Sequence, residues 1–451
     1  MTAARNPDAA VRLTAAGALY GVLTLVVFWW AARGGVQQLG TWESALASVG
    51  RLTGLVSSVL LLAQVVLMAR LPVLERAFGQ DRLAAVHRVV GFTSFDLMLA
   101  HLVLITWGYA AGDLTRTPAT FWELVTEYPG MLLALAGTVC LVLAVVTSVK
   151  AARRAIRYES WHLLHLYAYL GVGLALPHQL WTGTDFRSST AVTVAWWAAW
   201  GATVGAVLVW RVGVPVRRNM RHRLRVSHVV REGDGVHSVH LTGRALDRLA
   251  VDAGQFFGWR FLDRAGWTRG NPYSLSAAPD GRGLRITVKE SGDNSARVAE
   301  LRAGTRVVFE GPYGRLTGRA RTRSKVVLIG AGVGIAPLRA LAEGLAYAPG
   351  EVVVLHRFTG QPLFDAEFDE LVRTRGLRLV RLPGRRRASG SWLGAGTPDV
   401  DDVAALRVLV PDLVDRDVYV CGPSGWTATV RRCAENAGAP ADRVHVENFG
   451  W

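Results

Sequence analysis

The sequence predicts a multi-domain protein with an all-α membrane domain in its first half and β and α/β domains in its second half. The chain has 451 residues, of which 51% are hydrophobic. Long apolar runs crowd into the first half, and such runs are typical of membrane helices. Short alternating runs follow, and the last part alternates strand with helix. We therefore expect six transmembrane helices, an antiparallel β-barrel and an α/β domain with a parallel sheet.

Six apolar stretches are long enough to cross a bilayer, because a hydrocarbon core of ~30 Å requires ~20 helical residues. The N-terminal stretch has no A-x-A-like cleavage site, so we interpret it as a retained anchor rather than a signal peptide. The six stretches lie near 11–32, 45–69, 84–109, 130–149, 161–181 and 190–212.

Basic residues are unevenly distributed over the connecting loops. Arginine and lysine cluster after the second, fourth and sixth stretches, and the opposite loops contain few of them. Since positive loops face the cytoplasm, we expect both termini to be cytoplasmic and the protein to lie in the inner or plasma membrane. The net charge is +16, but no basic helix or known nucleic-acid motif is present, so we expect no nucleic-acid partner.

Histidines interrupt two of the predicted spans at matched depths. His87 and His101 are 14 residues apart, a rise of ~21 Å, and His165 and His178 are 13 apart, a rise of ~20 Å. Both stretches enter from the cytoplasm, so His87 is level with His165, and His101 with His178. Imidazole is costly in a membrane and usually functional there, and neutral imidazole is an axial ligand of haem iron. We therefore predict two b-type haems, each held between two histidines.

Other interpretations of these residues remain open. The four histidines could be buried polar groups bonded to neighbouring helices, although two matched depths argue against this. His162 lies one turn before His165 and is an alternative ligand or a propionate partner. Arg88 and Arg157 could pair with haem propionates or simply be cytoplasmic loop arginines.

Helical phase fits the two histidine pairs unequally. Fourteen residues return to within ~40° of the starting face, whereas thirteen end ~140° away from it. Pro177 precedes His178 and can kink the helix. Such a kink would turn the His178 side chain back toward the side of the helix that carries His165. The three cysteines form no C-x-x-C or C-x-x-C-H, so a disulfide framework, a zinc ribbon and covalently attached haem are not supported.

Three segments of the barrel region resemble the flavin-binding signature of the ferredoxin–NADP reductase superfamily: GQFF at 254–257, NPYSLSAAP at 271–279 and TVKESGDNS at 287–295. The resemblance implies FAD, with Tyr273 flanking the isoalloxazine and Ser274 near its N5. Asn271 stands where the family has a charged or imidazole side chain, which weakens the expected contact there. The implied flavin-binding residues are Gln255, Phe256, Asn271, Pro272, Tyr273, Ser274, Lys289, Gly292 and Ser295.

The α/β region carries a glycine-rich turn and a late C-G-P motif. Gly330, Gly332 and Gly334 lie between a strand and a helix, where backbone N–H groups can approach a pyrophosphate. The turn ends in Ile-Ala-Pro, with Pro337, rather than in a third Rossmann glycine, and so resembles the NAD(P)H site of the reductase superfamily. The resemblance places Cys421, followed by Gly422 and Pro423, beside the nicotinamide.

Two further features of the α/β region concern the nicotinamide nucleotide. Arg357 follows a strand and could meet a 2′-phosphate, so we favour NADPH over NADH, while the arginine run 385–387 could be a solvated face. The chain ends VENFGW. A terminal aromatic in this family stacks on the flavin, and Phe449 fits that role best, with Trp451 as the alternative.

Residues 10–451 as a whole resemble the ferric reductase / NADPH oxidase superfamily. The resemblance implies a haem domain at 1–214, an FAD-binding barrel at 215–320 and an NAD(P)H-binding domain at 321–451. It also implies electron flow from NAD(P)H through FAD and the inner and outer haems to an external acceptor. That acceptor could be oxygen, a ferric chelate or an extracytoplasmic redox protein. A haem sensor or transporter with a vestigial reductase half is the alternative class, and the intact motifs argue against it.

Overall fold

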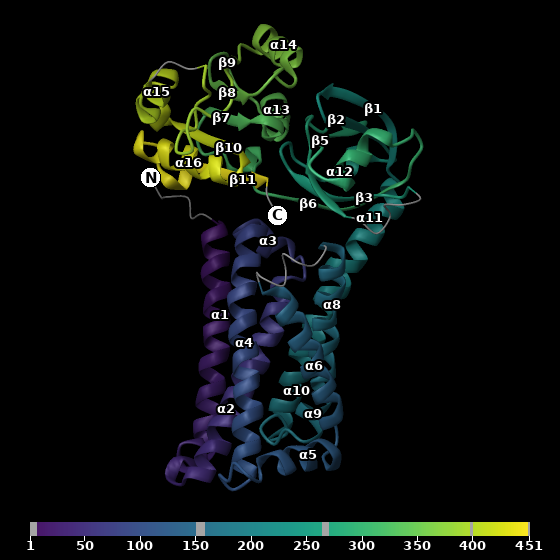
Figure 1. Cartoon of the computed structure of the whole chain (residues 1–451), viewed down its shortest axis with the longest axis vertical. Coiled ribbons are helices and arrows are strands. Elements are labelled where there is room, and N and C mark those ends of the chain that lie inside the picture. The colour runs from purple at the N-terminus through teal and green to yellow at the C-terminus, as the bar shows by residue number, and fades with distance from the viewer. Residues whose placement is uncertain (1–6, 150–157, 264–269, 397–399, 450–451) are drawn as a thin grey trace. The chain divides into compact units, whose positions relative to one another are not determined.

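The computed structural model describes residues 7–149, 158–263, 270–396 and 400–449 (Figure 1). The chain divides into two compact units, Met1–Val214 and Pro215–Trp451, and each unit has its own hydrophobic core. The first unit is helical. The second contains all of the described β-strands.

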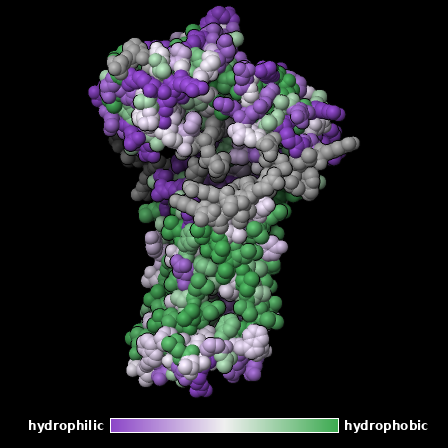
Figure 2. All heavy atoms as spheres, in the orientation of Figure 1, coloured by the Kyte–Doolittle hydropathy of each residue, from purple (hydrophilic) through white to green (hydrophobic). Residues whose placement is uncertain are grey.

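The first unit consists of long helices that pack side by side, with shorter helices at the ends of the bundle (Figure 1). Hydrophobic side chains cover most of the visible surface of this unit (Figure 2), as expected of a surface in contact with lipid. The long helices are α1 (Pro7–Trp30), α2 (Trp42–Leu67), α4 (Gln80–Tyr109), α6 (Met131–Ser148), α8 (Tyr158–Leu174) and α10 (Thr190–Ala206). The short ones are α3 (Pro72–Phe78), α5 (Thr117–Glu127) and α9 (Leu176–Trp181).

Among the described residues, five helices are long and apolar enough to cross a membrane: Asp8–Gly35, Trp42–Leu67, Arg82–Tyr109, Met131–Ser148 and Thr190–His222. The stretch expected as a further single span, 161–181, is instead two helices, α8 and α9, which are separated at Ala175. Pro177 lies in the first turn of α9, where its missing N–H and fixed φ are tolerated. The expected kink is thus a complete break in the helix.

Glycines let the membrane helices pack in close pairs. A Cβ at Gly50 of α2 would lie 2.9 Å from Ile105 of α4, and a Cβ at Gly108 of α4 would lie 2.7 Å from the Ala47 nitrogen of α2. The pair α6 and α8 meets in the same way, because Gly137 and Gly171 each face the carbonyl oxygen of the other. Small residues at such positions allow two backbones to approach closely in lipid.

The first part of the second unit is an antiparallel barrel. Its two three-stranded sheets have the orders β1-β2-β5 and β4-β3-β6. Isolated bridges from Leu275 to Ile286 and from Arg225 to Arg306 join the sheets at both edges, so few edge groups stay unpaired. The strands are β1 (Arg225–Gly233), β2 (Val236–Thr242), β3 (Phe256–Phe261), β4 (Asn271–Ser274), β5 (Gly283–Lys289) and β6 (Val307–Tyr313).

The second part is an α/β domain around a five-stranded sheet of order β11-β10-β7-β8-β9, in which all neighbouring strands are parallel. Apolar side chains fill both faces of the sheet, which explains the nearly continuous hydrophobic runs in the sequence. The strands are β7 (Lys325–Ala331), β8 (Val352–Phe358), β9 (Arg378–Pro383), β10 (Arg416–Pro423) and β11 (Val444–Phe449). The helices are α13 (Ile335–Gly344), α14 (Asp365–Arg375), α15 (Asp402–Leu409) and α16 (Ser424–Asn436).

The helix α11 (Val214–His222) adjoins the barrel through polar contacts. The side-chain amide of Asn219 donates to the carbonyl of Phe309 at 2.8 Å and accepts from its N–H at 2.9 Å. His222 Nδ1 lies 3.0 Å from the Arg244 carbonyl. The Asn219 contacts hold α11 against β6, and the His222 contact holds it against the segment that follows β2.

An ion-pair cluster fastens the start of β10. Asp412 accepts from Arg416 at 2.7 Å and from the Lys325 ammonium at 2.8 Å. The hydrogen bond from Arg416, together with the charge of Lys325, lowers the pKa of Asp412 to about 2. A carboxyl whose pKa is depressed by folding stabilises the fold above its ordinary pKa of about 3.9 and loses that contribution as pH falls.

We expect Asp412→Asn to lower the thermal unfolding temperature of the whole chain at pH 7 by about 2–4 °C, which corresponds to about 1 kcal/mol for a unit of this size. The difference from the parent should shrink as pH falls from 4 toward 2, where Asp412 itself becomes protonated. Asp442→Asn is the matched control, because this exposed carboxyl makes no ion pair with the described residues. A difference that is constant over this pH range would contradict the assignment.

Candidate functional site

The structure brings the four predicted histidines together as two pairs. The rings of His87 on α4 and His165 on α8 have centroids 6.1 Å apart and planes at 80° to each other. His178 on α9 lies near His101 on α4. The break between α8 and α9 is what allows His178 to face α4, since a continuous helix would carry it ~140° away from His165.

Both histidines of α4 are oriented by backbone carbonyls of α2. His87 Nδ1 lies 3.2 Å from the Gln64 carbonyl oxygen, and His101 Nδ1 lies 2.8 Å from that of Gly50. A carbonyl can only accept, so each Nδ1 carries a proton, and in neutral imidazole Nε2 is then the free acceptor. The two carbonyls are 14 residues apart on α2, as the two histidines are on α4.

A serine orients His165 in a similar way. Ser148 Oγ lies 3.2 Å from His165 Nδ1, donates to the Ala144 carbonyl at 2.6 Å and accepts from Trp161 Nε1 at 3.2 Å. Because its one proton goes to Ala144, the hydroxyl can only accept from His165. Trp161 also stacks on the imidazole at 5.2 Å. His165 therefore also has its Nε2 free.

His178 is held differently. Its Nδ1 is buried without a hydrogen-bond partner among the described residues, although the Ala175 carbonyl is nearby. Gly130 leaves room for its backbone, because a Cβ at position 130 would lie 2.8 Å from the His178 nitrogen. Gly54 leaves room for the ring of His101 in the same way, because a Cβ at position 54 would lie 2.5 Å from His101 Nδ1.

These donor sets fit bis-imidazole haem. An imidazole nitrogen binds a transition metal at about 2 Å, and each nitrogen lies about 1 Å from its ring centre, so two such bonds in line give a centroid separation of about 6 Å. The observed 6.1 Å between His87 and His165 agrees with that figure. The described residues contain no group of three or more histidine, cysteine or acidic side chains that could hold a metal, so a pair of imidazoles with a macrocycle suits the site better than a protein cage.

Three further residues, His162, Arg88 and Arg157, were expected near His87 and His165. The ring packed against His87 is that of His165, while His162 is tilted against Trp161 at 6.4 Å. Arg88 is exposed. Arg157 lies outside the described residues.

Several of the expected flavin residues lie on β4 and at the start of β3. Tyr273 is half-buried, and burial raises the pKa of its hydroxyl to about 12. Ser274 is buried, and its hydroxyl has no hydrogen-bond partner among the described residues. A buried hydroxyl normally has a hydrogen-bond partner, and a flavin ring edge would supply one. Phe256, next to β4, lies 5.8 Å from Tyr313, while Asn271 is half-buried and Pro272 exposed.

The other expected flavin contacts are partly engaged in local structure. Gln255 Oε1 accepts from the Asp252 nitrogen at 2.8 Å, which closes the loop before β3. Ser295 Oγ donates to the Gly292 carbonyl at 2.8 Å and accepts from the Ser291 nitrogen at 2.7 Å. Lys289 and Gly292 are exposed. Ser295 therefore shapes the phosphate-type loop and leaves Lys289 as its available cation.

The glycine-rich turn lies against the end of β10. Gly332 has a φ of +55°, a conformation that glycine adopts without strain. A Cβ at Gly334 would lie 2.5 Å from the Cys421 carbonyl, so only glycine lets the start of α13 approach β10. Gly330 is packed against Ile335, and Pro337 is buried in the first turn of α13. The expected nucleotide loop and the C-G-P motif are therefore adjacent.

Cys421 is fully buried at this junction, followed by buried Gly422 and exposed Pro423. Burial raises the pKa of the Cys421 thiol well above its ordinary value, and the carboxylate of Glu447 on β11 adds to the effect. The thiol is therefore neutral and a poor nucleophile, which suits a packing and positioning role. The side chain of Phe449 and the whole of Trp451 lie outside the described residues.

Two arginines meet at the carboxyl end of β8. Burial and the nearby Arg386 guanidinium lower the pKa of Arg357, whose Nε is buried without a partner among the described residues. Arg386 is held by the Ser391 carbonyl at 2.5 Å and by Thr429 Oγ1 at 3.0 Å. Two close cations form a place for an anion. The alternative that the run 385–387 is a solvated face is wrong for Arg386.

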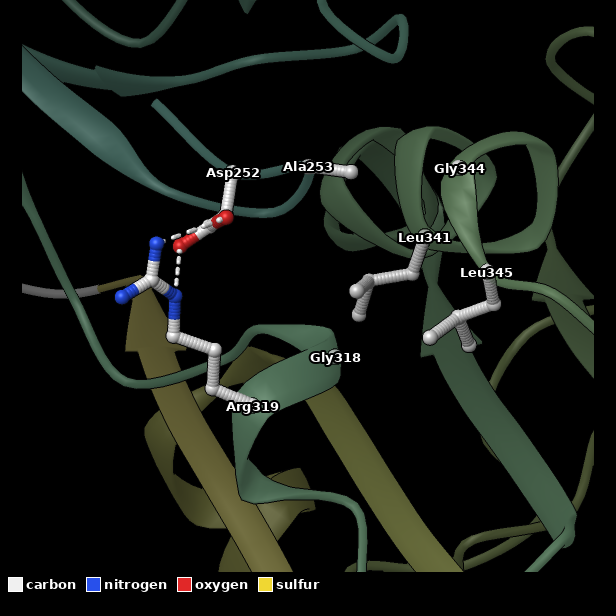
Figure 3. Close-up of a pocket in the computed structure, with 7 residues that line it drawn as sticks. All are labelled: Asp252, Ala253, Gly318, Arg319, Leu341, Gly344 and Leu345. Carbon is white, nitrogen blue, oxygen red and sulfur yellow. Dashed lines mark hydrogen bonds and ion pairs between the residues drawn. The ribbon is translucent and has the colours of Figure 1, made fainter. Parts of the chain in front are cut away.

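A hollow of about 220 Å³ lies at the other end of α13 from the glycine-rich turn. Asp252 and Arg319 form an ion pair at its rim, 2.7 Å apart, and Leu341 and Leu345 project into it (Figure 3). It is lined by Asp252, Ala253, Gly318, Arg319, Leu341, Gly344 and Leu345. None of the expected cofactor residues borders this hollow.

A four-residue cluster, Arg285, Glu367, Arg339 and Glu343, joins the barrel to the α/β domain. Glu367 on α14 pairs with Arg285 of β5 at 2.7 Å and with Arg339 of α13 at 2.6 Å. Both guanidiniums also donate to the Ser276 carbonyl. Burial alone would raise the pKa of Glu367, but the Arg285 hydrogen bond and the two guanidinium charges outweigh it, and the pKa lies below its usual value. The cluster fixes β4, with its flavin-type residues, relative to α13, which begins at the nucleotide-type turn.

Sequence reasoning missed the carbonyls of Gln64 and Gly50, the Ser148 hydroxyl and Arg386. Backbone acceptors have no sequence signature. The spacing of Gly50 and Gly54, a G-x-x-x-G pattern, could have indicated the close approach of α2 to another helix.

The fold and the paired imidazoles define a class of protein. It is a membrane protein that joins a helical transmembrane domain to a reductase-type barrel and α/β domain in one chain.

Comparison with known proteins agrees with both halves. Residues 53–176 match the family model of the ferric reductase like transmembrane component. A flavohemoprotein of Chromobacterium violaceum is 32% identical over 208 residues, 42% of this chain and 50% of the relative. The ferredoxin reductase component of 3-ketosteroid-9-alpha-monooxygenase from Mycolicibacterium smegmatis is 29% identical over 240 residues, 50% of this chain and 65% of the relative. The matched segment thus spans half to two thirds of these curated relatives.

Among solved structures, the FAD/NAD binding domain of nitric oxide dioxygenase from Vibrio cholerae aligns with 51% of this chain and 99% of its own, at 26% identity and a TM-score of 0.43. The transmembrane match and the flavohemoprotein match together correspond to the fused architecture of the ferric reductase / NADPH oxidase superfamily.

The cluster around Glu367 yields a stability prediction. We expect Glu367→Gln to lower the free energy of unfolding by about 2 kcal/mol, because two largely buried guanidiniums lose their shared carboxylate and the partial exposure of Glu367 moderates the cost. Glu370→Gln, one turn further along α14, is the control, since its pair with Arg373 is exposed and worth little. Thermal unfolding of the two variants measures the difference, and equal effects would contradict the role of the cluster.

Proposed function

We propose that this chain is a transmembrane NAD(P)H oxidoreductase. It passes electrons from cytoplasmic NADPH through FAD and two bis-histidine b-type haems to an acceptor on the outer face of the cell membrane. The observation that carries the proposal is the pair His87 and His165, 6.1 Å apart with Nε2 free on each ring. Its location in a ferric reductase like segment of a chain that also contains a flavohemoprotein-like reductase supports the same function.

In this proposal the chain crosses the membrane six times, with α8 and α9 together forming the broken fifth span. Both termini and the loops rich in arginine lie in the cytoplasm. His87 and His165 then form the inner ligand pair, and His101 and His178 the outer pair. The α2 carbonyls and Ser148 keep Nδ1 protonated, which directs Nε2 toward the iron and increases its basicity.

The flavin, when bound, supplies the conversion between the two-electron chemistry of nicotinamide and the one-electron chemistry of haem iron. Tyr273 offers an aromatic surface for its ring and Ser274 an otherwise unpaired hydroxyl for its edge. Gly330, Gly332 and Gly334 let backbone N–H groups approach a pyrophosphate. Neutral Cys421 packs behind the nicotinamide position, and Phe449 or Trp451 covers the flavin until the nucleotide enters.

The acceptor in this proposal is a ferric chelate or oxygen. His87 with His165, and His101 with His178, would each hold one iron through two imidazoles, and haem held in this way would supply electron transfer rather than binding of oxygen to the metal. The ferric reductase like description of the matching family favours the chelate. Oxygen, with superoxide as its product, and a redox protein outside the membrane are the competing acceptors.

The function is tested by anaerobic mixing of the purified chain with NADPH, followed by absorbance. We expect loss of the oxidised flavin band and then the appearance of reduced bis-imidazole haem. His101→Ala should lower the haem content from two per chain to one and leave flavin reduction intact. His162→Ala is the matched control and should keep both haems, because His165 is the ring that faces His87.

Absence of reduced haem in a preparation that contains flavin and two haems would refute the electron path. Ferric citrate and oxygen, offered separately to the reduced protein, then distinguish the acceptors by the rate of haem reoxidation.

Coenzyme choice should depend on the arginines at the end of β8. We expect Arg357→Ala and Arg386→Ala each to raise KM for NADPH about 10- to 100-fold, the loss of one charge-assisted hydrogen bond. KM for NADH should change little, because NADH has no 2′-phosphate. Arg378→Ala is the control, since this exposed arginine begins β9 and is in register with Val353, at the opposite end of the strands from Arg357. Equal changes for the two nucleotides would contradict the 2′-phosphate site.

A further inference from the structure

Asp96 is an acidic residue near the middle of a membrane helix. It lies on α4 within the apolar segment Arg82–Tyr109, about 20 Å of helix from either end. Its side chain is exposed, and the described residues supply it with neither a hydrogen bond nor an ion pair. Ionisable groups at this depth are costly and normally paired, so the carboxyl calls for a partner that the described residues do not provide.

The helical phase of α4 separates Asp96 from the haem-type site. Asp96 follows His87 by nine residues and precedes His101 by five, which places it ~180° and ~140° around the helix from them. The side of α4 that carries the histidines packs on α2, as shown by the Ser57 hydroxyl donating to the Ser94 carbonyl at 2.7 Å. Asp96 therefore faces away from α2 and from the paired imidazoles.

The surroundings of Asp96 on this face are apolar and uncovered. Val89, Phe92 and Val103 are 66%, 40% and 54% exposed. Thr93, one turn before Asp96, is also exposed and places a hydroxyl on the same face. Lipid tails cannot satisfy such groups.

A second copy of this chain would not bring a free cation to this depth. Arg88 on α4 itself is exposed but eight residues from Asp96, a rise of ~12 Å, so it lies at a different depth. On α2 the nearest described basic side chain is Arg51. Its guanidinium is held by Asp185 at 2.7 and 2.9 Å and by Gln38 at 2.9 Å. Charge complementarity therefore favours a different partner, one that carries a free basic residue in the middle of its own span.

We propose that the face of α4 formed by Val89, Phe92, Thr93, Asp96 and Val103 binds a transmembrane helix of a second membrane protein, and that a lysine or arginine at mid-membrane of that helix pairs with Asp96. The apolar side chains supply packing, and the carboxylate supplies orientation and depth. The docking surface is distinct from the proposed electron path, so either can fail without the other.

The test uses the full chain in zwitterionic lipid vesicles and a labelled synthetic helix of leucine and alanine with one central lysine. Energy transfer measures association, with an all-leucine helix and a helix whose lysine is moved by seven residues, ~10 Å, as comparisons. The central-lysine helix should bind about tenfold more tightly than either comparison, a difference typical of one polar pair between membrane helices. Asp96→Leu should remove that preference, whereas Asp113→Asn, just beyond the same helix, should keep it.

Equal binding of the three helices to the parent chain would overturn the proposal, even if Asp96→Leu failed to fold. Preference that survives in a folded Asp96→Leu variant would also overturn it. Energy transfer between two labelled copies of the chain that Asp96→Leu abolishes would assign the face to self-association instead.

Discussion

The hydrogen bonds from the α4 histidines to α2 carbonyls are the interactions on which the membrane unit depends. They require the α2 backbone to lie next to the imidazoles, and glycines at 50, 54 and 108 allow that approach. In lipid there is no hydrophobic gain from bringing helices together, so packing and hydrogen bonding must provide the attraction. The same contact therefore holds the helix pair together and fixes which ring nitrogen is available to a metal.

The second unit depends on a different constraint, the ion pairs that join the barrel to the α/β domain. The barrel and the α/β domain together form one compact unit, Pro215–Trp451. Arg285 and Glu367 are 82 residues apart in the chain and 2.7 Å apart in space. Together with Arg339 and the Ser276 carbonyl, these two residues form ion pairs and hydrogen bonds that fix the position of β4 relative to α13. Hydride transfer between two bound cofactors would need that positional accuracy.

Sequence reasoning succeeded where composition and period carry the information. Apolar length located the long helices, and the matched depths of His87 and His165 predicted the contact between their rings. It failed where a local break in a helix determines the direction of a side chain. The separation of α8 from α9 at Ala175 changes the direction of His178, and a proline marks such a break without specifying its angle. It also failed for Arg386, because a run of three arginines resembles a solvated surface until Thr429 and Ser391 are seen to hold one of them.

The helix α9 gives the two ends of the histidine site different stiffness. His87, His101 and His165 lie on helices of 17 residues or more, whereas His178 lies on a helix of six. A helix that short is unstable alone and depends on its neighbours. Here Gln179 bonds to Ser58 at 3.1 Å and accepts from Trp196 at 3.1 Å. Those two contacts fix the short helix, so the position of His178 depends on tertiary contacts more strongly than the positions of the other three histidines do.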